Sequence, residues 1–207
     1  MSREVDDEKR TTLRRFAALG AASPLAAAEV DAEESADGRE ARSDVRDAIR
    51  GYLGRTPGAH FSKLRDDLRL GTGETQHHLR RLESDGAVVS RRDGDYRRFY
   101  PADRFSAFEQ TALGYLRRET ARGILLTLLR ETDPTGADVA RTLDVSRATV
   151  SKYTSELEAA GLVDRSDGYA VRRPAVVVTL VVRYADSFGP DAVAFADEAP
   201  RLLSYDG

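Results

Sequence analysis

The 207-residue sequence contains no cysteine, which excludes disulfide bonds, thiolate metal sites and cysteine nucleophiles. It also has no run of roughly 18 consecutive apolar residues, the length that a membrane-spanning helix requires. Lysine is scarce, since only Lys9, Lys63 and Lys152 are lysine among the 32 basic residues. Arginine binds phosphate and guanine in bidentate fashion, although a GC-rich genome or a salt-rich cytoplasm also explains its excess.

The net charge of −3 is unevenly distributed along the chain. Residues 1–42 carry seven basic and ten acidic groups, and residues 175–207 carry two and five. The remaining residues, 43–174, hold 23 basic and 20 acidic groups, a net charge of +3. A modestly basic centre between acidic ends is compatible with nucleic-acid binding but does not establish it.

Residues 73–85 have the pattern of a helix with two different faces. Four residues at the spacing i, i+3, i+4 and i+7 form a packed side: Thr75, His78, Leu79 and Leu82. The opposite side can form hydrogen bonds with a base edge or a phosphate through Glu74, Gln76, His77, Arg80 and Arg81. Gly86 ends the helix. The pattern predicts a recognition helix, with Thr72 at its start.

A β-hairpin is predicted directly after this helix. Strands Ala87–Arg92 and Asp95–Tyr100 flank the dipeptide Asp93-Gly94, which is a strong signal for a two-residue turn. Four arginines surround its tip: Arg91, Arg92, Arg97 and Arg98. They repel one another unless an anion is near, so we interpret the hairpin as a wing that contacts phosphates. The alternative is a solvated hairpin whose repulsion is relieved by Asp93 and Asp95.

Two further short helices are predicted before the recognition helix. The first begins near Ser43 or Asp44 and ends at Thr56-Pro57-Gly58; its packed face is Val45, Ala48, Ile49, Tyr52 and Leu53. The second contains Phe61, Leu64 and Leu68, and a turn with Gly71 connects it to the third. Three helices of this kind form a helix-turn-helix.

The same design is repeated later in the chain. An amphipathic connector runs through Phe105, Phe108, Leu113 and Leu116, and a first helix follows with Ala121, Ile124, Leu125, Leu128 and Leu129. Thr135 opens a second helix through a capping box, and Ser146 caps a third. The packed positions of this third helix are Val150, Tyr153, Thr154 and Leu157. Each follows its counterpart in the recognition helix (Thr75, His78, Leu79 or Leu82) by the same number of residues. Gly161 follows Gly86 by that number as well, so the two segments are copies of one pattern. The exposed candidates for DNA contact are Arg147, Ser151 and Lys152, with Arg165 on a shorter wing.

Both ends of the chain lie outside the two copies. Pro174 begins a predicted helix over 175–188, and Asp191 caps a last helix with Pro200 as a kink. These helices have few basic residues and suit docking or homodimerisation. At the other end, Arg14-Arg15 and the apolar residues after them resemble a twin-arginine export signal; the alternative is a short amphipathic docking helix through Leu13, Phe16 and Leu19. An acidic linker, expected to be disordered, reaches residue 42.

No enzyme chemistry is expected. Adjacent His77 and His78 point to different faces of a helix, and His60 stands alone, so no metal site is predicted. The sequence also has no Walker-type phosphate loop and no Gly-x-Ser-x-Gly elbow. We therefore expect no cofactor.

The stretch His78-Leu79-Arg80-Arg81-Leu82, with Gly86-Ala87-Val88 after it, resembles the end of the recognition helix in ArsR- and MarR-like winged-helix regulators. Residues 146–163 look like a second copy, although Thr154 stands where an apolar residue is usual. Residues 57–61, 72–82 and 115–122 resemble tandem winged-helix proteins of halophilic archaea. The resemblance covers about residues 43–188 and implies sequence-specific transcriptional control.

We therefore expect a mainly α fold with small β-hairpin wings: two tandem winged helix-turn-helix domains plus C-terminal helices. The predicted divisions are 1–42, 43–104, 105–174 and 175–207. The expected function is a cytoplasmic transcriptional regulator that binds double-stranded DNA, with helix 73–85 in the major groove and wing 91–98 on the backbone. Two alternatives remain at this point: a winged-helix adaptor that binds proteins, and an exported or membrane-associated protein.

Overall fold

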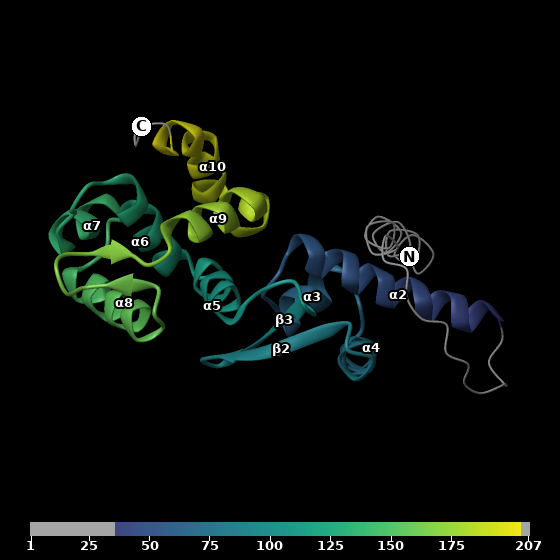
Figure 1. Cartoon of the computed structure of the whole chain (residues 1–207). Helices are drawn as coiled ribbons and strands as arrows, with labels where there is room; N and C mark the ends of the chain where they lie inside the picture. The colour runs from purple at the N-terminus through teal and green to yellow at the C-terminus, as the bar shows by residue number, and fades with distance from the viewer. Residues whose placement is uncertain (1–35, 204–207) are drawn as a thin grey trace. The chain divides into compact units, whose positions relative to one another are not determined.

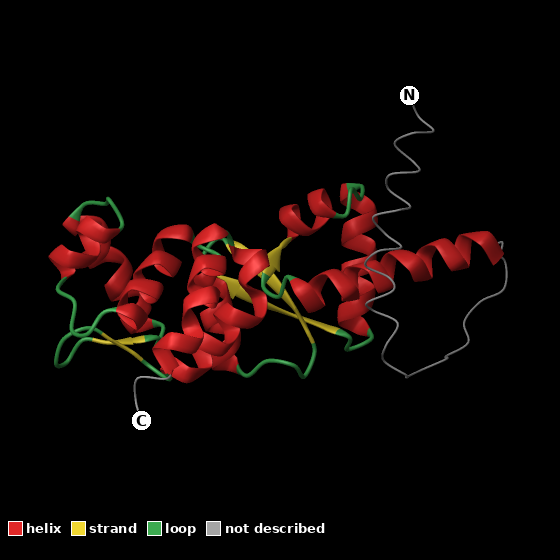
Figure 2. Cartoon of the chain, turned by 90° about the horizontal axis from the view of Figure 1, so that it is seen from above, coloured by secondary structure: helices red, strands yellow, loops and turns green. Residues whose placement is uncertain are grey.

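The computed structural model describes residues 36–203 (Figure 1), and the chain divides between Arg104 and Phe105 into two compact units. Each unit combines helices with a small antiparallel sheet, which confirms the predicted mainly α fold with hairpin wings. Figure 2 shows the long strands of the first unit and the two short strands of the second in yellow. The twin-arginine-like residues lie outside the described residues. Within residues 36–203, every helix is too short or too polar to span a bilayer.

The first unit is a winged helix-turn-helix domain with a three-stranded sheet in the order β1-β3-β2. Its elements are α2 (Ala36–Arg55), β1 (Ala59–His60), α3 (Phe61–Asp67), α4 (Thr72–Ser84), β2 (Val88–Asp93) and β3 (Tyr96–Pro101). The core confirms the predicted helix faces, because the five packed residues of α2 and Leu79 and Leu82 of α4 are buried in one cluster. Phe99 of β3 and Val88 of β2 join this cluster, so the hairpin is packed against the helices.

Two predicted boundaries in this unit are wrong. Helix α2 begins at Ala36 rather than at Ser43 or Asp44, so the segment predicted as a disordered linker is helical from there on. Alanine, arginine and glutamate dominate residues 36–42, and all three favour a helix. The hairpin turn is also one residue later than predicted: Asp93 pairs with Tyr96, which leaves Gly94-Asp95 as the turn. Gly94 has a φ of 59°, as the first position of a type II′ turn requires.

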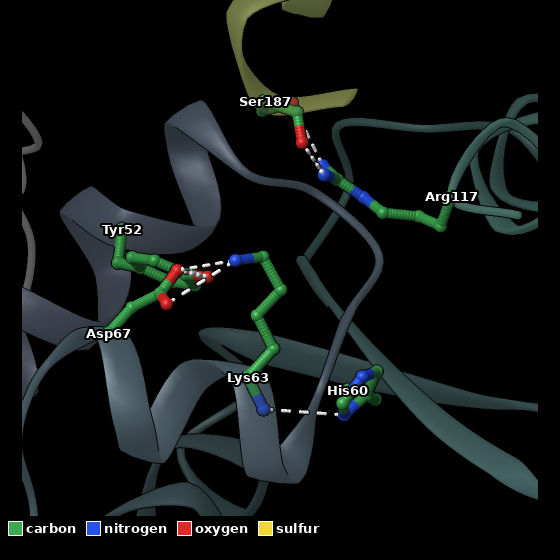
Figure 3. A network of polar contacts seen from close by, with 6 residues as sticks. All are labelled: Tyr52, His60, Lys63, Asp67, Arg117 and Ser187. Carbon is green, nitrogen blue, oxygen red and sulfur yellow. Dashed lines mark hydrogen bonds and ion pairs between the residues drawn. The ribbon is translucent and has the colours of Figure 1, made fainter. Parts of the chain in front are cut away.

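Helix α3 is held against α2 by a polar network (Figure 3). The Tyr52 hydroxyl donates to Oδ2 of Asp67 over 2.7 Å, and Nζ of Lys63 lies 2.9 Å from the same oxygen. Nδ1 of His60 accepts a hydrogen bond of 3.3 Å from the backbone N–H of Lys63, so His60 caps α3. The Tyr52–Asp67 bond joins α2 to α3, and the other two contacts stabilise α3 itself.

The second unit repeats the three-helix order and adds helices on both sides of it. Its elements are α5 (Ala107–Leu116), α6 (Glu119–Arg130), α7 (Gly136–Thr142), α8 (Arg147–Ala159), β4 (Val163–Asp164), β5 (Ala170–Val171), α9 (Pro174–Phe188) and α10 (Pro190–Leu203). Thr135 and Ser146 cap α7 and α8 as predicted. Thr154 is fully buried, but its hydroxyl donates to the carbonyl oxygen of Val150 over 2.8 Å, so the polar group is satisfied within α8.

The constant offset between the two copies extends beyond the third helix. Helices α3 and α7 begin at Phe61 and Gly136, and α2 and α6 end at Arg55 and Arg130. Helices α4 and α8, Thr72–Ser84 and Arg147–Ala159, correspond over their whole length. The copies diverge in the wing, where strands of six residues in the first unit correspond to strands of two residues in the second.

The C-terminal helices are built into the second unit. Helix α9 packs on α5 and α10, and α10 also contacts α6. Arg122 of α6 is buried and donates from Nε to Oδ2 of Asp191 over 2.7 Å, which ties α10 to the core. Asp191 lies in the first turn of α10 rather than capping it, because the helix starts at Pro190. In the same unit, Arg117 contacts Ser187 at the end of α9 (Figure 3).

Up to residue 200, most of the apolar side chains of these helices are therefore buried inside the unit rather than left for a partner. Val182, with 44% of its surface exposed, is the large apolar residue that α9 leaves in solvent. Pairing of two chains through α9 and α10 stays a prediction.

Candidate nucleic-acid interface

Helix α4 has one buried and one exposed face, as the sequence predicts. Thr75, His78, Leu79 and Leu82 are buried. The helix starts at the N-cap Gly71, whose backbone N–H donates to Oε2 of Glu74 over 3.1 Å, and the Thr75 hydroxyl donates to the carbonyl oxygen of Gly71 over 2.8 Å. These bonds fix the first turn. The exposed residues, called the reading face below, are Thr72, Gln76, His77, Arg80 and Arg81.

The two arginines of the reading face differ in their contacts. Among the described residues, Arg80 has no ion pair, whereas Nε of Arg81 lies 3.3 Å from Oδ1 of Asp85. Both side chains of that pair are about half exposed, so the pair is weak and an anion can replace Asp85. Within the described residues, Arg80 thus presents an unpaired positive charge and free hydrogen-bond donors on the reading face.

The hairpin β2–β3, called the wing below, distributes its four arginines over both faces. Opposite residues of an antiparallel pair share a face, and alternate residues along a strand point to opposite faces. Arg92 lies opposite Arg97 on one face, and Arg91 lies opposite Arg98 on the other. The Arg92–Arg97 face is the one that meets α4, because Arg97 contacts Glu83 at the end of that helix. Arg92 is exposed and makes no ion pair within the described part of the chain.

The prediction that Arg98 contacts DNA is wrong, since only 2% of its surface is exposed. Its guanidinium pairs with Asp93, donates from Nη1 to the carbonyl oxygen of Gly58 over 3.1 Å and lies above the ring of Tyr96. Arg98 therefore joins the wing to the turn before β1. Consecutive strand residues point in opposite directions, so Arg97 and Arg98 could not both face a duplex.

Arg97 is also engaged within the protein. Its Nη2 atom donates to Oε1 of Glu83 over 2.7 Å, and its Nε atom donates to the hydroxyl of Ser90 over 2.8 Å. The side chain is still 60% exposed, so its contact with phosphate is not sterically excluded. Glu83 was not among the predicted site residues, although Glu158 stands at the equivalent position of the second copy.

The second copy has a less cationic reading face. Arg147, Ser151 and Lys152 are exposed at the start of α8, as predicted. Ser155 and Glu156, however, occupy the positions equivalent to Arg80 and Arg81. Arg165, a predicted DNA contact, instead donates from Nη1 to the hydroxyl of Ser155 over 2.9 Å and pairs with Glu158 at 3.3 Å.

The tip of the second wing is acidic. Oδ1 of Asp164 accepts hydrogen bonds from the Ser166 hydroxyl over 2.6 Å and from its backbone N–H over 3.0 Å, and Arg172 donates to Oδ2 over 3.0 Å. These donors, with Ser166 the strongest, lower the pKa of Asp164 from 3.8 to about 2. The carboxylate of Asp133 lies against Gly168 in the same turn, and Asp167 is exposed. Asp164 and Arg172 thus neutralise each other, whereas Arg92 of the first wing has no ion pair among the described residues.

No metal centre is formed within residues 43–200, whose side chains the structure describes, since no three potential ligands among histidine, aspartate and glutamate come together there. His78 is buried at the edge of the core, and its ring contacts that of His77 at a centroid distance of 5.2 Å. The first unit has a hollow of about 370 Å³ between the end of α2 and the base of the wing, lined by Arg50, Gly54, Val88, Pro101 and Arg104 among others. None of its lining residues belongs to the reading face.

Two family models match the chain over adjacent segments. A model described as an N-terminal HTH domain matches residues 43–113, and a model of the MarR family matches residues 120–174. An uncharacterized HTH-type transcriptional regulator of Methanocaldococcus jannaschii is 30% identical over 121 residues, which cover 58% of this chain. The match covers 30% of the length of that curated relative. These similarities agree with the two copies seen in the fold.

Proposed function

We propose that this chain, a tandem winged helix-turn-helix protein, is a transcriptional regulator that binds double-stranded DNA sequence-specifically. The observation that carries the proposal is the pair of exposed arginines, Arg80 on the reading face and Arg92 on the adjoining face of the wing, neither of which has an ion pair within the described residues. The matched family models and the name of the M. jannaschii relative support the same function.

In this proposal α4 enters the major groove and the wing follows the backbone. Gln76 and Arg80 contact bases, because an amide pairs in bidentate fashion with adenine and a guanidinium with guanine. Thr72, His77, Arg81, Arg91 and Arg92 contact phosphates and set the register of the helix. The exposed cations of the second copy, Arg147 and Lys152, contribute phosphate contacts together with Ser151.

The first unit makes the larger contribution to specificity. Its reading face has two arginines where the second copy has Ser155 and Glu156. Its wing also carries Arg92 without a counter-ion among the described residues, whereas Arg165 and Arg172 of the second wing pair with Glu158 and Asp164. Sequence discrimination therefore depends mainly on α4, and the second unit adds affinity.

The test is a genome-wide map of the DNA bound in cells. The proposal expects discrete sites that share a sequence motif, loss of these sites in Arg80→Ala, and their retention in Arg55→Ala, which removes an exposed arginine at the end of α2. A protein-binding adaptor would give no motif of its own, or a pattern that Arg80→Ala leaves intact. That result would contradict the proposal.

A further inference from the structure

We infer that the ion pair between Glu83 and Arg97, called the helix–wing pair below, sets the position of the wing relative to the reading face. Arg97 is then a positioning residue rather than a phosphate contact. The inference rests on the proposed function, because it assigns a role within the same DNA-binding surface.

Arg97 is fixed at several points. Its Nη2 atom donates to Glu83 over 2.7 Å, its Nε atom donates to Ser90 over 2.8 Å, and its guanidinium carbon lies 5.5 Å from the centre of the Phe99 ring. Glu83 has only 20% of its side chain exposed. An ion pair between two freely moving surface side chains contributes little, but a guanidinium held by several partners loses less entropy when the pair forms.

The position of Arg92, the wing arginine that we expect to contact DNA, depends on how Arg97 is held. Arg92 lies directly opposite Arg97 in the sheet, on the same face. When Arg97 is held by Glu83 at the end of α4, the position of Arg92 relative to the reading face is held as well. Loss of the pair would leave the tip of the hairpin free to move away from the helix, because Arg92 and both turn residues, Gly94 and Asp95, are exposed.

The second copy forms the same kind of contact with different residues. Glu158 is the equivalent of Glu83, and it pairs with Arg165 at 3.3 Å. Arg165 corresponds to Ser90 in the first copy rather than to Arg97, and it also donates to Ser155 over 2.9 Å. In both units, therefore, a glutamate near the end of the third helix holds an arginine of the wing. The contact is kept although the residues that make it from the wing have changed.

If the helix–wing pair positions the wing, removal of Glu83 should change DNA affinity in the direction opposite to that expected from the loss of a negative charge. Glu83 is an acid next to a DNA-binding surface, so its loss should strengthen binding if only Coulomb repulsion of phosphates matters. If Glu83 positions the wing, its loss should weaken binding instead. Asp85 provides a matched control, because it is an acid at the same end of α4 and pairs with Arg81 rather than with the wing.

The experiment measures binding of the full chain to a labelled duplex of mixed sequence over a series of salt concentrations. We expect Glu83→Ala and Arg97→Ala each to weaken binding about two- to fivefold, the double variant to be no weaker than Arg97→Ala, and Asp85→Ala to bind as well as wild type or better. The slope of log K against log salt should be unchanged in Arg97→Ala. Tighter binding by Glu83→Ala, or a slope reduced by about 1 in Arg97→Ala, would identify Arg97 as a phosphate contact and overturn the inference.

Hydrogen exchange of the free protein separates this inference from the proposed function. Glu83→Ala and Arg97→Ala should speed exchange of the amides of residues 94–97 to the same extent, and Asp85→Ala should not. Unchanged exchange in the first two variants would overturn the inference even if DNA binding is confirmed. If wild-type protein binds no duplex, the proposed function fails, and the exchange result still decides whether the pair holds the wing.

Discussion

Nη1 of Arg98 donates to the carbonyl oxygen of Gly58 over 3.1 Å, and this bond joins the wing to a turn 40 residues earlier in the chain. The same guanidinium pairs with Asp93 beside the hairpin turn. Arg98 thus neutralises a carboxylate, satisfies a buried carbonyl and connects β3 to the start of the helix-turn-helix.

The first prediction concerns the stability of this connection. Arg98→Ala should lower the free energy of unfolding by about 2–4 kcal/mol, because it leaves Asp93 and the carbonyl of Gly58 without their buried partner. Arg92→Ala, one strand away and exposed, should change it by no more than about 0.5 kcal/mol. Urea denaturation followed by circular dichroism measures both. Equal effects of the two substitutions would show that Arg98 has no structural role.

The second prediction concerns base recognition. Arg80→Ala should reduce affinity for a matched site by about 1–3 kcal/mol and relax the preference at one base pair. The reduction should be much smaller on scrambled DNA. Competition binding with a set of single-base variants of the site measures this. If Arg80→Ala lost the same affinity on matched and scrambled duplexes, Arg80 would be a backbone contact.

The third prediction concerns the backbone contact of the wing. Arg92→Ala should weaken binding to all sequences alike and reduce the slope of log K against log salt by about 1, as expected for the loss of one phosphate contact. The sequence alone suggested this role for all four wing arginines, but Arg97 is held by Glu83 and Ser90. A salt titration with Arg55→Ala as control checks the assignment. An unchanged slope would exclude Arg92 from the contact.

The fourth prediction uses the lowered pKa of Asp164. A carboxyl whose pKa in the folded protein, about 2, lies below its ordinary value of 3.8 stabilises the fold above that ordinary value and loses this contribution as pH falls. Wild type should therefore be more stable than Asp164→Asn at pH 6, and the difference should shrink between about pH 4 and pH 2. Thermal unfolding over this range tests it.

Asp167→Asn is the control for this comparison, because Asp167 lies on the same turn and makes no hydrogen bond among the described residues. Asp167→Asn removes no hydrogen bond of the described residues, so it should change the unfolding temperature less than Asp164→Asn does at pH 6. A gap between wild type and Asp164→Asn that stays constant down to pH 2 would contradict the proposed cause of the pKa shift.

Periodicity predicted the helices well, because one packed face is a local property of the chain. Val45, Ile49 and Leu53 of α2 are fully or almost fully buried, as their spacing indicates. The position of Thr154 shows how a departure from the pattern is accommodated, since its hydroxyl bonds to the carbonyl of Val150. A polar side chain that finds its partner one turn earlier in the same helix does not disturb the packing around it.

The roles of the wing arginines were harder to predict, because they depend on which carboxylates and carbonyls the fold brings to each strand face. Arg98 meets Gly58, and nothing in the local sequence indicates that contact. The alternation of side chains along a strand does predict that Arg97 and Arg98 point in opposite directions. The repeat also indicates a shared role for Glu83 and Glu158, because the two glutamates occupy the same position in the two copies.

The most direct test of DNA recognition by α4 and its wing is the binding of purified full-length protein to double-stranded DNA at moderate ionic strength. We expect wild type to bind a duplex from its mapped sites more tightly than a scrambled duplex. We also expect Arg80→Ala combined with Arg92→Ala to lose both this preference and most of the affinity. If wild type bound no duplex, or if the double variant bound as wild type does, the assignment of DNA recognition to this surface would be wrong.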